Sequence, residues 1–472
     1  MYSLWILGAI SFLLSLGLTP LARNIFAKWG VLDKPDHVRK FHGCGIPRVG
    51  GVPLALSYVA ALLIALVFPI HTGTTIRHAI PLAIRLLPAA GLIFAVGLID
   101  DVFGLPAKQK LGGQILASIF VLLVGIHVES IGGHPLPIWV SVPVTIIWLV
   151  GCANAVNLID GLDGLAAGVG LFAATTALIV GLLGHNFELA IVTVPLVGSL
   201  LGFLCYNFNP ASIFLGDSGS LLIGFLLGCF GILWSEKSAT VLGMTAPLIA
   251  LSIPLMDVGL AVVRRFLRQQ PIFGADRGHI HHKLLARGLT PRRVALVLYM
   301  ACTLSAVLAL LQSFADERFA SVIVVLCCVC VWMGIQYLGY VEFGTAGQLV
   351  ARGAFRHLLN AHIALASFED ALKKAHDVES CWEVIEETHK TFGFSDVEST
   401  VNGVHRRGVI KDHSSCTWSV TIYLNDDYVR LYRLENSAIE PALAAHYAEC
   451  IRKVLLPHLK PVRKFRTAAS GT

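Results

Sequence analysis

Carboxamides and carboxylates recur at short intervals in one stretch, residues 154–165, which reads Asn-Ala-Val-Asn-Leu-Ile-Asp-Gly-Leu-Asp-Gly-Leu. This stretch directly follows an apolar run that makes up most of a membrane span. Its first three polar residues are three positions apart, so they share one face of a helix. Its two glycines let a ligand approach the backbone closely. A solvated loop is the alternative, but the spacing favours a polar ligand bound at a membrane face. The candidate ligand-binding side chains are Asn154, Asn157, Asp160 and Asp163.

Two adjacent carboxylates, Asp100 and Asp101, close another apolar run. Such a pair at a membrane boundary is costly unless it shares a cation or a proton. Lys108 and Lys110 follow shortly afterwards and supply positive charge. The acids could simply mark the end of a span, because helix ends often carry charges. Other acidic clusters fall on the same membrane face, so we expect this pair to belong to a functional site.

Asp217 stands between two glycines in Gly-Asp-Ser-Gly-Ser, just before a further apolar run, and therefore at a predicted helix N terminus. Hard oxygen ligands with retained water suit Mg²⁺, and the free N–H groups of a helix N terminus favour anions. We therefore expect a divalent cation that links Asp217 to a phosphate. The alternative is that Asp217 or Ser218 serves only as the helix N-cap. Asn207, in the preceding segment, could add a side-chain amide.

Three imidazoles, an arginine and a lysine crowd residues 276–283. Zinc is the obvious alternative, but the i, i+2, i+3 spacing does not place all three imidazoles on one helical face. No cysteine completes a four-ligand set, and the cationic neighbours would repel a metal. We expect an anion-binding cluster instead. Its candidate members are Arg277, His279, His281 and His282.

The composition indicates a multispanning membrane protein, because 55% of the 472 residues are hydrophobic and only 14% are charged. We interpret the eleven scattered cysteines as buried reduced thiols. The fold class that we predict is an all-α polytopic membrane protein followed by a small cytoplasmic α+β domain. Apolar runs of about 17 to 22 residues predict eleven transmembrane helices, near residues 3–22, 50–69, 81–99, 113–128, 137–156, 165–183, 188–204, 219–234, 241–261, 294–313 and 319–341.

The basic residues gather in alternate loops, which predicts the orientation of the chain. By the positive-inside rule the amino terminus lies outside and the carboxyl terminus in the cytoplasm, which agrees with an odd number of spans. Five polar clusters then converge on the cytoplasmic face: residues 33–51, 100–110, 154–165, 207–220 and 276–283.

Charged residues return after about residue 344, so we divide the chain into a multispanning domain, 1–343, and a cytoplasmic α+β domain, 344–472. We predict helices at 347–376, 380–391 and 436–456 and strands at 395–401, 416–425 and 428–434. The histidines of this domain lack regular metal spacing, and we expect them to be surface residues. Its role remains unassigned.

Taken together, the motifs resemble the polyprenyl-phosphate N-acetylhexosamine-1-phosphate transferase family of glycosyltransferase family 4 type. The resemblance covers about residues 1–341 and rests on the ordered set rather than on any one motif. His-x-His-His resembles the form found in the GlcNAc-type branch rather than the His-His-His of the phospho-MurNAc-pentapeptide transferases. The set comprises Pro47…Gly50-Gly51, Asp100-Asp101, Asn154-x-x-Asn157-x-x-Asp160-Gly-x-Asp163, Gly216-Asp217-Ser-Gly-Ser and His279-x-His281-His282.

The resemblance implies transfer of GlcNAc 1-phosphate, or that of a close N-acetylhexosamine, from its UDP-sugar to undecaprenyl phosphate with release of UMP. Mg²⁺, or Mn²⁺, would be the cofactor, held by Asp217 with Asp101, while Asp100 would act as base or orient the lipid phosphate. Phosphoryl transfer needs charge neutralisation and in-line positioning above all. The resemblance assigns catalysis to Asp100, Asp101, Asp160, Asp163 and Asp217. It assigns substrate binding to Lys40, Lys110, Asn154, Asn157, Asn207, Arg277, His279, His281 and His282.

Other classes of protein fit less well. A transporter needs its ionisable residues near the bilayer midplane, often with repeat symmetry, and a sensor would leave the five membrane-face clusters without a task. A pentapeptide-transferase-like activity stays open as the alternative enzyme. The expected partners are a polyprenyl phosphate lipid and a UDP-N-acetylhexosamine in a bacterial inner membrane, without nucleic acid, and a homodimer stays open.

Overall fold

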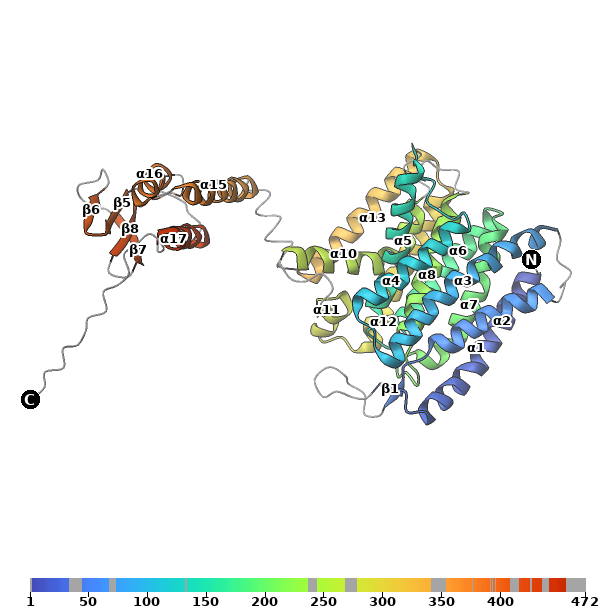
Figure 1. Ribbon diagram of the computed structural model, residues 1–472. Coiled ribbons are helices and arrows are strands. Elements are labelled where there is room, and N and C mark those ends of the chain that lie inside the picture. Colours follow the sequence, from blue (N-terminus) through green and yellow to red (C-terminus); the bar gives the residue numbers. More distant parts are fainter. Residues whose placement is uncertain are drawn as a thin grey trace, which may run out of the picture. The chain divides into compact units, whose positions relative to one another are not determined.

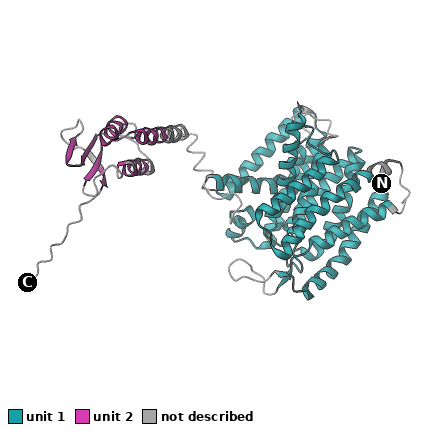
Figure 2. Cartoon of the chain, in the orientation of Figure 1, with its two compact units in different colours: residues 1–340 teal, residues 341–472 magenta. Residues whose placement is uncertain are grey.

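The computed structural model divides the chain into two compact units, residues 1–340 and 341–472 (Figure 2). Each unit is described here by itself. The structure describes residues 2–33, 45–67, 74–131, 134–236, 244–267, 278–340, 354–375, 377–390, 392, 394, 396–407, 416–424, 427–434 and 441–455.

The first unit is a bundle of helices (Figure 1). Two short antiparallel strand pairs accompany it, β1 (Leu32–Asp33) with β2 (Ile46–Pro47) and β3 (Ser130–Ile131) with β4 (His134–Pro135). The helices are α1 (Tyr2–Lys28), α2 (Gly51–Val67), α3 (Thr74–Phe103), α4 (Ala107–Leu123), α5 (Ile138–Ile159), α6 (Leu165–Leu183), α7 (Phe187–Asn207), α8 (Gly216–Glu236), α9 (Thr245–Ala250), α10 (Ser252–Leu267), α11 (Ile280–Ala286), α12 (Pro291–Phe314) and α13 (Glu317–Leu338).

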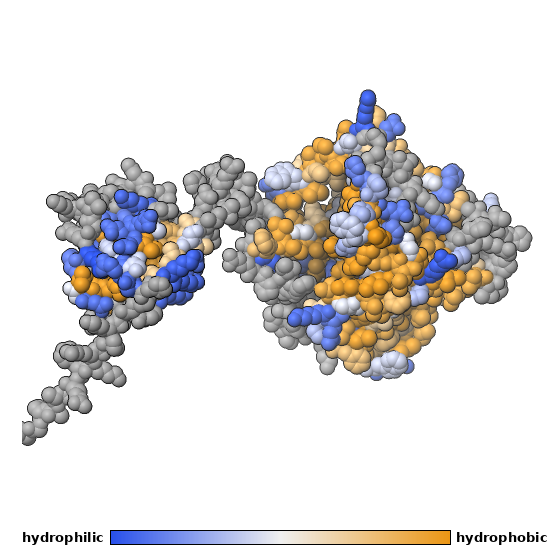
Figure 3. All heavy atoms as spheres, turned by 45° about the horizontal axis from the view of Figure 1, so that its top comes forward, coloured by the Kyte–Doolittle hydropathy of each residue, from blue (hydrophilic) through white to orange (hydrophobic). Residues whose placement is uncertain are grey.

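The prediction of a helical multi-pass membrane protein is confirmed. Within the described part of the chain, eight helices are long and apolar enough to cross a membrane: α1, the 81–103 part of α3, α5, α6, α7, α8, α12 and α13. The other three predicted spans fall on α2, α4 and the interrupted pair α9–α10, which are shorter. Hydrophobic side chains cover much of the visible face of this unit (Figure 3), as a lipid-facing surface requires.

Helix α8 lies at the centre of the bundle, and nearly all of its side chains are buried. Two glycines allow its neighbours to come this close. A Cβ at Gly97 of α3 would lie 2.5 Å from the Asp217 carbonyl oxygen, and one at Gly224 of α8 would lie 2.4 Å from the Cys152 carbonyl oxygen of α5. Backbone therefore packs against backbone along α8, which fixes its N-terminal end relative to α3 and α5.

The second unit is an α+β fold built on a four-stranded antiparallel sheet of order β6-β5-β8-β7. The predicted strands and helices correspond to β5, β7, β8, α15, α16 and α17. The four-residue strand β6 was not predicted, because its His-Arg-Arg run lacks an apolar alternation. The elements are α15 (Ala354–Lys374), α16 (Val378–Thr388), β5 (Asp396–Val401), β6 (Val404–Arg407), β7 (Cys416–Leu424), β8 (Asp427–Leu434) and α17 (Pro441–Leu455).

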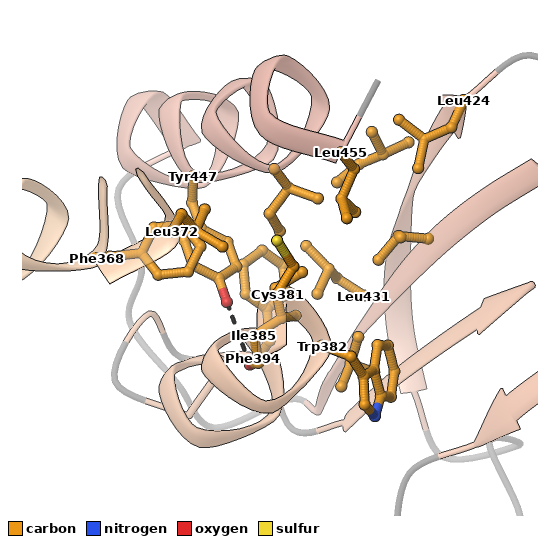
Figure 4. Close-up of a cluster of buried hydrophobic side chains, with 14 of the residues drawn as sticks. Phe368, Leu372, Cys381, Trp382, Ile385, Phe394, Leu424, Leu431, Tyr447 and Leu455 are labelled. Carbon is orange, nitrogen blue, oxygen red and sulfur yellow. Dashed lines mark hydrogen bonds between the residues drawn. The ribbon is translucent and has the colours of Figure 1, made fainter. Parts of the chain in front are cut away.

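The three helices pack on one face of this sheet and form a core of their own (Figure 4). Tyr447 of α17 sits at its centre, fully buried, with its ring 4.4 Å from that of Phe368 and 4.3 Å from that of Phe392. Its hydroxyl group donates a hydrogen bond to the Ile385 carbonyl oxygen at 3.4 Å. The unit thus has the separate hydrophobic core expected of an independent domain.

The packing of α8 leads to a stability prediction. Gly224→Ala should lower the free energy of unfolding by about 2 kcal/mol, because its methyl group would overlap the backbone of α5. Gly151→Ala on α5 is the matched control, since a Cβ there meets no atom within 4 Å, and it should leave stability equal or slightly higher. Thermal unfolding in detergent would measure both, and equal melting temperatures for the two variants would contradict the close contact.

Candidate active site

Asp101, at the end of α3, holds the first turn of α8. Its carboxylate accepts hydrogen bonds from the backbone N–H groups of Asp217 (2.8 Å) and Ser218 (2.9 Å) and from the Ser218 hydroxyl group (2.6 Å). These bonds satisfy N–H groups that a helix leaves without internal partners, and the carboxylate also complements the helix dipole. The Asp101 side chain is 0% exposed, and these contacts fix the first turn of α8. Direct metal ligation by Asp101 stays a prediction.

The side chain of Asp217 is therefore not the cap of its own helix. One of its oxygens contacts Arg48, and the other accepts a hydrogen bond from the Lys110 ammonium group at 2.7 Å. The same ammonium group lies 2.8 Å from Asp100, whose second oxygen accepts the Leu105 N–H at 2.7 Å. Asp100 and Asp217 thus converge on a single cation at the ends of α3, α4 and α8.

Arg48 is a site residue that the sequence interpretation did not select. Its Nε lies 3.6 Å from Asp101, its terminal nitrogen contacts Asp217, and 45% of its side chain remains exposed. The sequence did contain a signal for this residue, because Arg48 lies inside the Pro-Arg-Val-Gly-Gly element. A cation beside two glycines marks a place where a charged group and closely packed backbone coincide.

The backbone around Arg48 is fixed by pairing with the segment that precedes α8. Gly50 and Gly51 donate their N–H groups to the carbonyl oxygens of Phe214 (2.9 Å) and Leu215 (3.0 Å), and Phe214 N–H donates to the Pro47 carbonyl oxygen (2.9 Å). A Cβ at Gly50 would lie 2.6 Å from the Phe214 carbonyl oxygen. Only glycine fits at this position without a steric clash. The backbone pairing places Arg48 beside the N terminus of α8.

A polar pocket of about 270 Å³ opens beside these charges. It is formed by the end of α5, the loop before α6, the end of α7 and the segment before α8. At its wall, burial raises the pKa of Asp160 to about 7, and neighbouring carboxylates add to this against the opposing effect of Arg48. The lining residues are Arg48, Asp160, Gly161, Leu162, Asp163, Asn207, Phe214 and Leu215.

Two of the predicted ligand residues hold the walls of this pocket. Asp163 accepts hydrogen bonds from the Asn209 side chain and the Ala211 N–H, both at 3.0 Å, and so joins the loop before α6 to the loop after α7. Asn207 donates to the Ile213 carbonyl oxygen at 2.9 Å and is buried. Both residues line the pocket, and these contacts are structural. Their predicted roles in catalysis and substrate binding stay predictions.

The two asparagines of α5 bind neighbouring helices. Asn154 exchanges hydrogen bonds with Gln114 of α4, at 2.7 and 3.3 Å. Asn157 donates to the Ser220 hydroxyl group of α8 at 3.0 Å. Asp160 follows the last residue of α5 and has a non-helical backbone (φ −74°, ψ 54°), so the predicted helical face holds only the two asparagines. Among the described contacts these fix α5 between α4 and α8. Substrate binding by either stays a prediction.

The histidine segment lies against the loop before α6. His281 is buried, and a Cβ at Gly161 would lie 2.4 Å from its Nε2. Neither of its ring nitrogens has a hydrogen-bond partner among the described residues. Burial, and then the neighbouring His282, lowers the pKa of His281 to about 4. At that pKa the imidazole is neutral at pH 7, so His281 would serve the predicted anion-binding cluster as a hydrogen-bonding group rather than as a cation.

Asp257 of α10 is the second site residue that was missed. One oxygen accepts the Ile280 N–H at 2.8 Å, and the other lies 3.0 Å from His279 Nδ1. An ionisable residue inside an apolar run is itself a signal of function, and Asp257 lies within the predicted span 241–261. Lys40 and Arg277, by contrast, lie outside the described residues.

The oxygen donors of the site fit Mg²⁺. Asp100 and Asp217 already share one bound cation, the Lys110 ammonium group. Among the described residues no group of three or more His, Cys, Asp or Glu side chains is arranged to hold a metal ion. Mg²⁺ is commonly bound by one or two carboxylates together with substrate phosphates and water, so two carboxylates beside a polar pocket suffice.

Fold and site together define a multi-pass membrane protein with a carboxylate- and cation-lined site suited to phosphate chemistry. Residues 83–235 match the family model described as glycosyl transferase family 4. A probable undecaprenyl-phosphate N-acetylglucosaminyl 1-phosphate transferase of Bacillus subtilis is 36% identical over 62% of this chain and 80% of the relative. The chain belongs to glycosyl transferase family 4.

Two further relatives have printed names of the same kind. A decaprenyl-phosphate N-acetylglucosaminephosphotransferase of Mycobacterium leprae is 36% identical over 56% of this chain and 72% of the relative. An undecaprenyl-phosphate alpha-N-acetylglucosaminyl 1-phosphate transferase of Thermotoga maritima is 32% identical over 65% and 89%. Each match leaves about a third or more of this chain uncovered.

The raised pKa of Asp160 predicts a pH dependence. Its carboxyl group is neutral below about pH 7 and ionised above it, so a reaction that needs the carboxylate should gain kcat/KM as pH rises through 7. Asp160→Asn should remove that limb, whereas Asp163→Asn should keep it. Ionisation of the substrates affects every variant in the same way. The wild-type pH profile divided by the Asp160→Asn profile therefore isolates the contribution of the Asp160 carboxyl group. A flat ratio would contradict the prediction.

Proposed function

We propose that this protein transfers GlcNAc 1-phosphate from UDP-GlcNAc to a polyprenyl phosphate, giving polyprenyl-diphosphate-GlcNAc and UMP. The observation that carries the proposal is the cluster of Asp100, Asp217, Lys110 and Arg48 at the edge of a polar pocket. The printed names of the relatives, which are polyprenyl-phosphate GlcNAc-1-phosphate transferases, support the same substrates.

The reaction joins a lipid phosphate to a soluble nucleotide sugar, so the site must lie at headgroup level. An oxygen of the lipid phosphate attacks the β-phosphorus of the UDP-sugar, and the bond from that phosphorus to the bridging oxygen breaks as UMP leaves. Such a transfer depends mainly on positioning and charge neutralisation. A two-step route through an aspartyl phosphate is the alternative.

The residues of the site divide these tasks. Asp217 and Asp100 would hold Mg²⁺, which when bound neutralises charge on the diphosphate. Arg48 and Lys110, released from the carboxylates, would neutralise the remaining phosphate charge; a guanidinium group suits this because it binds phosphate in a bidentate manner. Asp100 would also orient the lipid phosphate. Neutral His281 would hydrogen-bond an oxygen of the nucleotide sugar across the loop before α6.

The cellular setting completes the proposal. The bacterial relatives support a location in the bacterial cytoplasmic membrane. The basic loops support an orientation with the amino terminus outside and the active site and residues 344–472 in the cytoplasm. Residues 1–343 would form the transferase domain, acting either alone or as a homodimer. The lipid-linked sugar would begin a cell-surface polysaccharide, such as an O-antigen or cell-wall polymer.

A direct assay tests the reaction. Purified protein in detergent would be incubated with undecaprenyl phosphate, Mg²⁺ and radiolabelled UDP-GlcNAc, and label would be followed into the organic phase together with release of UMP. EDTA should abolish the product. UDP-MurNAc-pentapeptide, offered in parallel, should yield none, and transfer from it alone would favour the pentapeptide-transferase alternative.

Asp217→Asn should lower kcat at least about 100-fold, because it removes a charged ligand at the point where phosphate charge develops. The amide keeps the size of the side chain, so the variant should insert in the membrane and melt near the wild-type temperature. The lipid-product assay and thermal unfolding measure the two quantities. An active, Mg²⁺-dependent variant would remove Asp217 from the mechanism.

Arg48→Gln should lower kcat/KM for UDP-GlcNAc about 100-fold, since a charge-assisted, bidentate phosphate contact is lost. Arg48→Lys should recover only part of this loss because an ammonium group lacks the planar fork. Arg293→Gln, an exposed position on α12, is the control and should match wild type. Equal losses for Arg48→Gln and Arg293→Gln would indicate a general charge effect.

A further inference from the structure

The histidine segment, His279 to His282, sits at the start of a helix that cannot hold itself in place. Helix α11 has only seven residues, and so short a helix is unstable without tertiary contacts. Its N-cap residue, His279, makes no side-chain capping hydrogen bond to it. The position of the imidazoles must therefore come from other elements.

The first anchor is Asp257 on α10, which is 1% exposed. By accepting the Ile280 N–H at 2.8 Å it caps α11 from outside. Its other oxygen, 3.0 Å from His279 Nδ1, favours the tautomer with the proton on Nδ1. His279 Nε2 is then left as the nitrogen that can act elsewhere, which is how a carboxylate commonly orients a functional histidine.

The second anchor is Tyr340, which lies two residues after the end of α13. Its hydroxyl group donates to the carbonyl oxygen of Gly278, the residue before His279, at 2.9 Å. The side chain is buried, with the Arg264 guanidinium group 5.4 Å and the Lys283 ammonium group 4.8 Å from the ring centre. Such cation–π contacts add to the hold on the ring.

The fit around Gly278 is close. A Cβ there would lie 2.4 Å from the Arg264 guanidinium carbon, so α10 and the start of α11 meet without spare space. At the other end of α11, Arg287 donates to the Tyr337 carbonyl oxygen and lies over the Tyr337 ring at 4.3 Å. The end of α13 thus contacts both ends of α11.

We propose that Asp257 and Tyr340 are positioning residues that together hold the histidine segment against the pocket. The pair acts through the backbone on either side of His279: Tyr340 fixes the carbonyl group before it, and Asp257 fixes its ring and the N–H group after it. His281, two residues further, is thereby kept beside Gly161. The kinetic part of this inference rests on the proposed function, but the structural part does not.

The test uses the full chain in detergent and two variants, Tyr340→Phe and Asp257→Asn. Tyr340→Phe removes one hydroxyl group and keeps the ring between its cations. Tyr423→Phe makes the same chemical change at an exposed site in the second unit and serves as the control. Melting temperatures would be recorded for all variants.

The first measurement is carbethoxylation of histidine by diethylpyrocarbonate, read by peptide mass spectrometry, which needs no activity. In wild type and Tyr423→Phe, buried His279 and His281 should react slowly, while exposed His282 reports that the reagent is active. In Tyr340→Phe and Asp257→Asn, both buried histidines should react at least about fivefold faster, in line with the loss of a hydrogen bond. Unchanged rates in both variants would overturn the proposal.

The second measurement separates positioning from a general loss of folded protein. Tyr340→Phe should raise KM for UDP-GlcNAc about fivefold and leave KM for the lipid phosphate within about twofold. A variant that only unfolds in part would lower kcat and leave both KM values unchanged, and that result would overturn the proposal. Faster labelling in an enzyme whose wild type fails to use UDP-GlcNAc would uphold the positioning and reject the proposed function.

Discussion

The three hydrogen bonds that Asp101 accepts from the N terminus of α8 are the interaction on which the site depends. A carboxylate without exposed surface can stay ionised only where donors compensate its lost hydration, and the first turn of a helix supplies them. The three hydrogen bonds set the direction of the Asp217 side chain. The close glycine contacts along α8 keep the helix from shifting. The central helix and the charged cluster are therefore one structural unit.

The charge balance of that cluster follows from the same constraint. Asp100, Asp101 and Asp217 face Arg48 and Lys110, so three negative and two positive charges leave one net negative charge. A divalent cation would reverse the sign to one net positive charge. An anionic diphosphate would then meet a favourable field only with the metal present. Arg48 and Lys110 neutralise part of the carboxylate charge in this structure.

Much of this architecture was accessible from the sequence, because it rests on local patterns. Apolar runs located the helices, and alternating basic loops predicted that the polar clusters share one membrane face. The individual contacts were not accessible, since they join distant segments: Arg48 meets Asp217 across 169 positions and Lys110 meets it across 107. Nothing local distinguishes the acid that caps a helix, Asp101, from its neighbour Asp100, which binds a lysine.

This ambiguity has a physical origin in the membrane setting. The walls of the pocket are loops at helix ends, where backbone groups must be satisfied close to a medium that offers few hydrogen-bond partners. Asp163 and Asn207 satisfy them here, and they are the same residue types that bind nucleotides and metals. The residues that hold this pocket and those that would use it thus have the same chemistry, so loss of activity on substitution cannot separate them. Asp257 is the converse case, because its residue type suggests a ligand-binding group but its contacts are structural. This carboxylate supports the histidine segment and does not line the pocket.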